Sequence, residues 1–240
     1  MKLAYSVQPE IAVFNDLSQL IISRKSVPVT LFLCGGSAIK IYQYFSDKFD
    51  AFLALAKTVS VTDFSYLTIS LTDDRWFKDL NNENINSAVI KKTGLITKFE
   101  KYGASFIPMT NSIEIKDDVN NFNNIMIKHF NEDYKILIGG VGLDGHTCGI
   151  IPQNNEELFR SKYGLDQYCT DVIVDNIHPN RITLTPYSLI KMDDCLIYMS
   201  GDEKKNVLTN LLYESKAEWE MPSIVYQSNK NAKIYTDILL

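Results

Sequence analysis

Residues 139–152 (GGVGLDGHTCGIIP) are the part of the chain best suited to chemistry. They hold five of the chain's eleven glycines and one of its three histidines, His146. A neutral imidazole is a suitable general base near pH 7, and Asp144, two residues earlier, can fix its tautomer. Glycines let the backbone place such a ring beside several N–H groups, which can stabilise an oxyanion. We interpret this stretch as a loop that presents His146 as a general base supported by Asp144.

The same stretch admits two other interpretations. Residues 140–145 (GVGLDG) match the G-x-G-x-x-G pattern of dinucleotide-binding turns. That pattern must open a helix, and Gly149 and Pro152 follow too closely for one. A nicotinamide cofactor is therefore not expected. Cys148, two residues from His146, offers a Cys–His nucleophile, but such pairs usually come from separate segments, so it stays a minor alternative.

Two further clusters follow apolar runs. Residues 35–37 (GGS) combine glycines, which allow close backbone approach, with Ser37, which can cap a helix whose free N–H groups suit a phosphate. Residues 73–75 (DDR) place two carboxylates beside an arginine, which can hold a phosphate or carboxylate in a bidentate fork. Arg181, and one of Lys204 and Lys205, can add positive charge. Taken alone, each cluster is equally compatible with an ordinary turn or a solvated surface corner.

The elements that must position these clusters alternate between two patterns. Continuous apolar runs bounded by turn residues predict strands, and amphipathic stretches between them predict helices. Such alternation is typical of a mainly parallel sheet covered on both faces, in which ligands bind at the carboxyl ends of the strands. The clusters above follow three such ends, so we expect a single shared site. The expected strands are 27–34, 65–73, 134–142, 181–186, 194–201 and 223–228, and the expected helices are 37–49, 83–93, 116–131, 186–192 and 202–214.

Composition excludes several classes of protein. The 240 residues carry a net charge of −5, with 45% hydrophobic and 22% charged residues, which is ordinary for a globular chain. No basic stripe indicates nucleic-acid binding, no apolar run approaches the ~20 residues of a membrane span, and the N-terminus lacks a signal-peptide core. The four dispersed cysteines indicate neither a zinc site nor a disulfide framework. We expect one cytoplasmic domain over residues 1–240, a monomer or weak dimer, without metal or cofactor.

Six motifs in this order and spacing resemble the bacterial 6-phosphogluconolactonases, from about residue 30 to 225. They are LCGGSA, LTDDRW, ENINSAVI, GGVGLDGHTCGIIP, NRITLT and GDEKKNVL. The resemblance implies a three-layer α/β/α fold, shared with glucosamine-6-phosphate deaminases, and hydrolysis of 6-phospho-D-glucono-1,5-lactone to 6-phosphogluconate. This reaction is the second step of the oxidative pentose phosphate pathway and needs no metal.

The resemblance also implies roles for individual residues. His146 would be the general base that activates water and Asp144 its support. The substrate and its phosphate would be held by Gly35, Gly36, Ser37, Asp73, Arg75, Arg181 and Lys204.

This chain departs from the pattern of the resembled family at several points. The family usually has Asp-Glu-Arg at residues 73–75 and a Ser-Asn pair where we align Glu83-Asn84. The related deaminases carry a glutamate five residues after the histidine, where this chain has Ile151, so we favour a lactonase over a deaminase. An alternative to an enzyme is a non-catalytic protein of the same fold that senses sugar phosphates.

Overall fold

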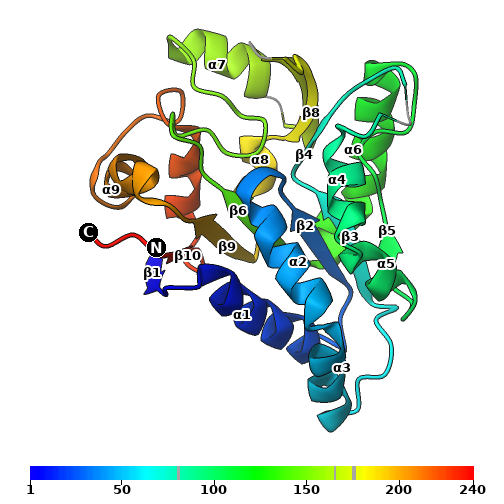
Figure 1. Ribbon diagram of the computed structural model, residues 1–240. Coiled ribbons are helices and arrows are strands. Elements are labelled where there is room, and N and C mark those ends of the chain that lie inside the picture. The colour runs from blue at the N-terminus through cyan, green and yellow to red at the C-terminus, as the bar shows by residue number, and fades with distance from the viewer. Residues whose placement is uncertain (80–81, 165, 175–176) are drawn as a thin grey trace.

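The computed structural model describes residues 1–79, 82–164, 166–174 and 177–240. Its main feature is a seven-stranded sheet in which every pair of neighbouring strands is parallel. Figure 1 shows these strands crossing the middle of the molecule. In spatial order they are β1 (Lys2–Tyr5), β10 (Lys233–Thr236), β9 (Asp194–Met199), β6 (Tyr134–Gly140), β2 (Val29–Leu33), β3 (Leu67–Leu71) and β5 (Ser105–Phe106).

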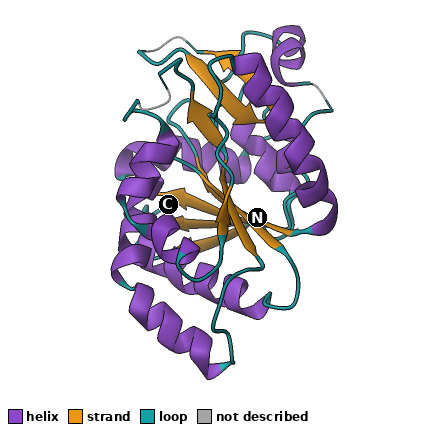
Figure 2. Ribbon diagram, turned by 90° about the vertical axis from the view of Figure 1, so that its right-hand side faces the viewer, coloured by secondary structure: helices purple, strands orange, loops and turns teal. Residues whose placement is uncertain are grey.

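Helices cover both faces of this sheet, as Figure 2 shows. The inner strand β2 buries all five of its side chains, which is why its sequence is mainly apolar. The longest helix has its apolar residues at helical spacing, so one stripe is buried, including Val119, Phe122, Met126 and Phe130. The helices are α1 (Pro9–Ser23), α2 (Ile39–Asp47), α3 (Phe49–Thr58), α4 (Asn86–Lys92), α5 (Leu95–Glu100), α6 (Ile115–Glu132), α7 (Glu156–Tyr163), α8 (Pro186–Leu189) and α9 (Lys205–Tyr213). The expected three-layer α/β/α fold with a mainly parallel sheet is confirmed.

A second, antiparallel sheet lies beyond the carboxyl ends of the larger one (Figure 2). Its strands are β4 (Asp73–Arg75), β8 (Asn180–Leu184) and β7 (Cys169–Ile173). The chain passes from β3 to β4 through Thr72 alone. The Thr72 amide donates to Leu33 O at 3.0 Å and its carbonyl accepts from Leu184 N at 2.8 Å. This single residue therefore ties the two sheets together.

One expected strand was wrong, and another is a strand of a different sheet. Residues 223–228 form a 3₁₀ helix (Pro222–Ser228) instead of a strand, since Pro222 begins a helical turn and a short buried apolar run has no diagnostic period. The expected strand 181–186 is present as β8 but belongs to the smaller antiparallel sheet, where Ile182, Thr183 and Leu184 are buried.

The expected helix 37–49 is a 3₁₀ turn (Gly36–Ala38) followed by α2, and α3 then extends to residue 58. Of the helices in the described segments, none combines the length and the apolar character needed to cross a bilayer.

Candidate active site

A cavity of about 270 Å³ lies where the carboxyl ends of β2 and β6 meet the smaller sheet. Eight of the nine expected site residues line it: Gly35, Gly36, Ser37, Asp73, Arg75, His146, Arg181 and Lys204. The ninth, Asp144, contacts His146. A larger hollow of about 600 Å³ beside α7 and α8 contains none of these residues, so the smaller cavity is the candidate site.

His146 and Asp144 form a close pair. The ring Nδ1 lies 2.6 Å from Asp144 Oδ1, which also accepts from the His146 backbone N–H at 3.1 Å. Burial tends to raise the pKa of Asp144, but the hydrogen bond and charge of His146 outweigh it, so the pKa is lowered. An ionised Asp144 places the ring proton on Nδ1 and leaves the lone pair on Nε2. The pair therefore has the arrangement of an oriented general base.

Gly142 lies directly beneath this pair. A Cβ at Gly142 would lie 2.1 Å from His146 Nδ1 and 2.7 Å from Asp144 Oδ1, far inside van der Waals contact. Gly145 adopts φ of +85°, which favours glycine. At least these two glycines of the loop therefore serve the placement of His146.

The loop that carries the pair is fixed at both sides. The Thr147 hydroxyl donates to Gly140 O at 2.9 Å and lies 2.5 Å from the buried Tyr226 hydroxyl. Gly149 N donates to Thr183 Oγ1 at 2.8 Å, which joins the loop to β8. A bridge between Thr147 and Ile150 follows in place of a helix, and α7 begins only at Glu156. The G-x-G-x-x-G pattern therefore lacks the helix that dinucleotide binding requires.

The glycine-serine turn approaches the cavity from β2. A Cβ at Gly35 would lie 2.8 Å from Asn86 Oδ1, so glycine is needed for this close approach. Gly36 adopts φ of +67°. The expected capping role of Ser37 was wrong: Ser37 lies inside the 3₁₀ turn, and the residue at the N-cap of α2 is Ala38.

Two arginines face each other across β4 and β8. Arg75 pairs with Arg181 in the antiparallel register, an arrangement that like charges disfavour. Arg181 Nη1 lies 3.2 Å from Asp73 Oδ2, and Arg75 Nη1 donates to Asn84 O at 2.9 Å. Within the described segments, the buried Nε atoms of both arginines have no hydrogen-bond partner. The two guanidinium groups thus retain the capacity to bind an anion.

Lys204 is the lysine that reaches the cavity. Burial lowers its pKa, while nearby Cys34 and Glu203 act in the opposite direction. The Lys205 ammonium instead donates to Leu239 O at 2.8 Å. The sequence left open which of the two lysines reaches the site, and in the structure Lys204 lines the cavity.

Two thiols, Cys34 and Cys148, also line the cavity. Burial raises the pKa of Cys34 to about 12, and burial likewise raises that of Cys148, with Asp73 acting in the same direction on both. Thiols with such pKa values stay protonated and are poor nucleophiles at neutral pH. The Cys–His alternative is therefore not favoured.

Asn86 is the cavity residue that sequence reasoning missed. It is buried, and its Nδ2 donates to Asp73 O at 3.1 Å. Asn84, which we aligned with the family's Ser-Asn pair, is exposed and offers its carbonyl oxygen to Arg75. The position of Asn86 at the start of an amphipathic helix, soon after the acidic cluster, could have identified it.

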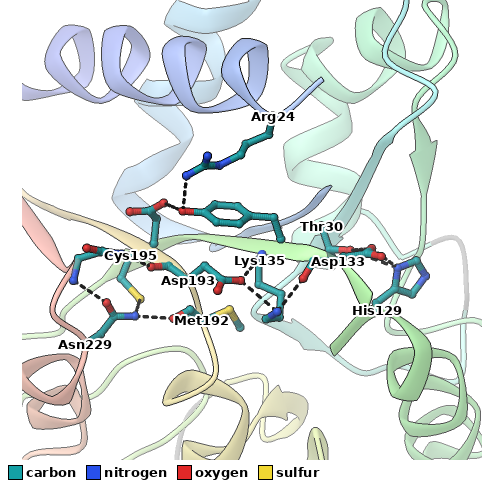
Figure 3. A network of polar contacts seen from close by, with 12 residues as sticks. Arg24, Thr30, His129, Asp133, Lys135, Met192, Asp193, Cys195 and Asn229 are labelled. Carbon is teal, nitrogen blue, oxygen red and sulfur yellow. Dashed lines mark hydrogen bonds and ion pairs between the residues drawn. The ribbon is translucent and has the colours of Figure 1, made fainter. Parts of the chain in front are cut away.

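His129 lies at the amino ends of strands β2 and β6, at the opposite end of the strands from the cavity, in the network shown in Figure 3. Its Nδ1 lies 2.6 Å from Asp133 Oδ2, which also accepts from the Thr30 hydroxyl at the amino end of β2. The Lys135 ammonium donates to Asp133 O at 2.7 Å in the same network. This histidine joins α6 to the sheet and takes no part in the cavity.

Comparisons with known proteins place the chain in a family. The family of glucosamine-6-phosphate isomerases/6-phosphogluconolactonase matches residues 11–235. The 6-phosphogluconolactonase of Helicobacter pylori is 27% identical over 172 residues, which are 71% of each chain. That of Xylella fastidiosa is 27% identical over 154 residues, 62% of each chain.

A solved structure of a 6-phosphogluconolactonase from Shewanella baltica has the same fold. It superposes with a TM-score of 0.77 at 18% identity, covering 99% of this chain and 96% of that one. The chain therefore belongs to the family of glucosamine-6-phosphate isomerases and 6-phosphogluconolactonases, and its relatives named above are 6-phosphogluconolactonases.

Proposed function

We propose that this chain hydrolyses 6-phospho-D-glucono-1,5-lactone to 6-phosphogluconate, with His146 as the general base. The observation that carries the proposal is one cavity shared by an oriented histidine–carboxylate pair and three cationic side chains. The pair suits activation of water beside an ester carbonyl. The cations Arg75, Arg181 and Lys204 suit a phosphate at the other end of the same small substrate.

The proposed reaction has two steps. His146 Nε2 takes a proton from water as the water oxygen bonds to the lactone carbonyl carbon, which gives a tetrahedral oxyanion. The oxyanion collapses, the bond from this carbon to the ring oxygen breaks, and His146 returns its proton to that oxygen. The product is the open-chain carboxylic acid, which ionises in water. Asp144 stabilises the protonated ring between the steps, and backbone N–H groups lining the cavity suit the oxyanion.

The phosphate supplies binding energy away from the reacting carbon. Arg75 and Arg181 stand opposite one another, and a phosphate between them would relieve the repulsion of their charges. Gly35, Gly36 and Ser37 complete the wall of the cavity on the side of β2, where close backbone approach is possible. Asp73, which already contacts Arg181, suits a sugar hydroxyl.

Ile151 supports the lactonase over a deaminase. It stands where the deaminases carry the glutamate, and its backbone N–H bonds the Tyr163 hydroxyl at 3.1 Å. An aliphatic side chain cannot orient a histidine by hydrogen bonding. In this chain Asp144 contacts His146 instead.

The cellular setting is part of the proposal. All four cysteines are free thiols, which suits a reducing compartment. We therefore place the reaction in the cytoplasm, and the monomer or weak dimer expected from the sequence stays a prediction.

The decisive experiment generates the lactone in situ and follows its loss. We expect wild type to accelerate hydrolysis well above the buffer rate, and His146→Ala to lose roughly 10²–10⁴-fold of that acceleration. His129→Ala is the matched control, since it removes an imidazole that lies at the amino ends of the strands, away from the cavity. Wild-type activity equal to buffer would reject the lactonase. Binding of 6-phosphogluconate without turnover would then indicate the sensor, and release of ammonia from glucosamine 6-phosphate the deaminase.

A further inference from the structure

Asp74 is a fully buried carboxylate that lies next to the cavity without lining it. Its Oδ1 accepts two backbone N–H groups, from Arg75 at 2.8 Å and from Asn86 at 2.6 Å. Its Oδ2 lies 3.5 Å from the Thr110 hydroxyl. One oxygen atom therefore holds the backbone of β4 and the first residue of α4 together.

A chain of contacts leads from Asp74 into the cavity. Asn86, whose backbone Asp74 holds, donates from Nδ2 to Asp73 O at 3.1 Å and lies 3.4 Å from Asp73 Oδ2. The same Asp73 Oδ2 accepts from Arg181 Nη1 at 3.2 Å. Asn86, Asp73 and Arg181 all line the cavity. Asp74 thus does not line the cavity but is linked by hydrogen bonds to three residues that do.

We propose that Asp74 is a positioning residue for substrate binding, whose Oδ1 sets Asn86, and through it Asp73 and Arg181, at the substrate. This inference rests on the proposed function. It concerns binding more than chemistry, because the residues it places include Arg181, one of the cations proposed to hold the phosphate.

The surroundings of Asp74 are costly for a carboxylate. Burial raises its pKa to about 7, the Asn86 N–H lowers it and the charge of Asp73 raises it. The charged neighbours on its own strand are Asp73 and Arg75, while α4 offers N–H and hydroxyl groups and the opposing residue on β8 is Ile182. Because burial disfavours the charge, the property that matters at this position is an oxygen atom that accepts two backbone N–H groups.

The test compares the loss of that oxygen with its retention. Asp74→Ala removes the acceptor, and we expect KM for the lactone to rise at least about tenfold, with a smaller change in kcat. Asp74→Asn keeps an oxygen at Oδ1, and we expect KM within about threefold of wild type. Asn86→Ala should reproduce the rise in KM. The double variant Asp74→Ala/Asn86→Ala should be no worse than the more severe single variant, because both act through one path.

Asp133→Ala is the control for a purely structural effect. Asp133 is a buried carboxylate that contacts Thr30 and His129 at the amino ends of the strands, away from the cavity (Figure 3). We expect it to lower the melting temperature without raising KM. The proposal is overturned if Asp74→Ala folds with wild-type KM, or if the two single effects multiply in the double variant.

Should Asp74→Ala fail to fold, Asn86→Ala decides, since it leaves both N–H bonds to Asp74 in place, and an unchanged KM there overturns the proposal. Failure of the proposed function itself is distinct, because wild type would then show no turnover at all.

Discussion

Gly142→Ala should reduce the activity of this chain while leaving its stability almost unchanged. The added Cβ would lie 2.1 Å from His146 Nδ1 and 2.2 Å from Cε1, whereas real Cβ contacts essentially never fall below 3.0 Å. The ring must therefore move by about 1 Å, and a displacement of this size can cost on the order of 10²-fold in rate. His146 and Asp144 have side chains 40% and 52% exposed, so they can swing towards water. We expect kcat to fall roughly 10²-fold while stability changes by less than about 1 kcal/mol.

The assay pairs lactone hydrolysis with thermal unfolding followed by circular dichroism. Gly140→Ala, at the end of β6 just before the loop, is the matched comparison, because a Cβ there meets nothing closer than Cys34 Sγ at 3.8 Å. We expect its loss of kcat to be far smaller. The reasoning is refuted if Gly142→Ala keeps kcat within a few-fold of wild type, or if Gly140→Ala loses as much.

Three further predictions follow from the walls of the cavity. Arg75→Gln or Arg181→Gln should raise KM about ten- to a hundredfold with little change in kcat, since each removes charge-assisted hydrogen bonds to phosphate; an unchanged KM in steady-state kinetics counts against the phosphate site. Tyr226→Phe removes the hydroxyl contact to Thr147 and should cost about 1 kcal/mol in urea unfolding; unaltered stability would show that the contact contributes nothing. The raised pKa of Asp74 means that the folded chain keeps a proton that the unfolded chain releases near pH 4, so stability should fall as pH rises from about 4 to about 7. Asp74→Asn has no carboxyl group to titrate, so its free energy of unfolding relative to that of wild type should increase by up to about 4 kcal/mol across that window. If urea titrations give the same difference in unfolding free energy at pH 4.5 and pH 8, this prediction is refuted.

The sequence was sufficient for the four adjacent inner strands β9, β6, β2 and β3 of the larger sheet and for most of the site, whereas β1, β5 and β10 were not expected. Glycines and charges directly after continuous apolar runs predict strand ends, and parallel strands bring their carboxyl ends to one edge. His146, Arg75 and Gly35 could be grouped on this basis alone, although they are far apart in the chain. Eight of the nine expected site residues line the cavity for this reason.

The missed features depend on long-range contacts. Strand β4 has only three residues, all charged, so no hydrophobic period marks it. Asn86 lines the cavity, and its backbone N–H donates to Asp74 Oδ1, a contact across 12 positions of the chain that no local pattern indicates. Ile224, Val225 and Tyr226 are buried in a segment that contacts the His146 loop through Ser223 and Tyr226, and burial alone does not distinguish a strand from a helical turn.

Thr72 limits how this chain can change in length over evolution. Side chains alternate along a strand, so one inserted residue beside Thr72 would exchange the two faces of β4. Asp73 and Arg75 would turn away from the cavity and Asp74 would turn towards it. Surface segments between other elements can accept insertions and deletions, but here a single-residue change in length would separate the binding of the phosphate from the chemistry at His146.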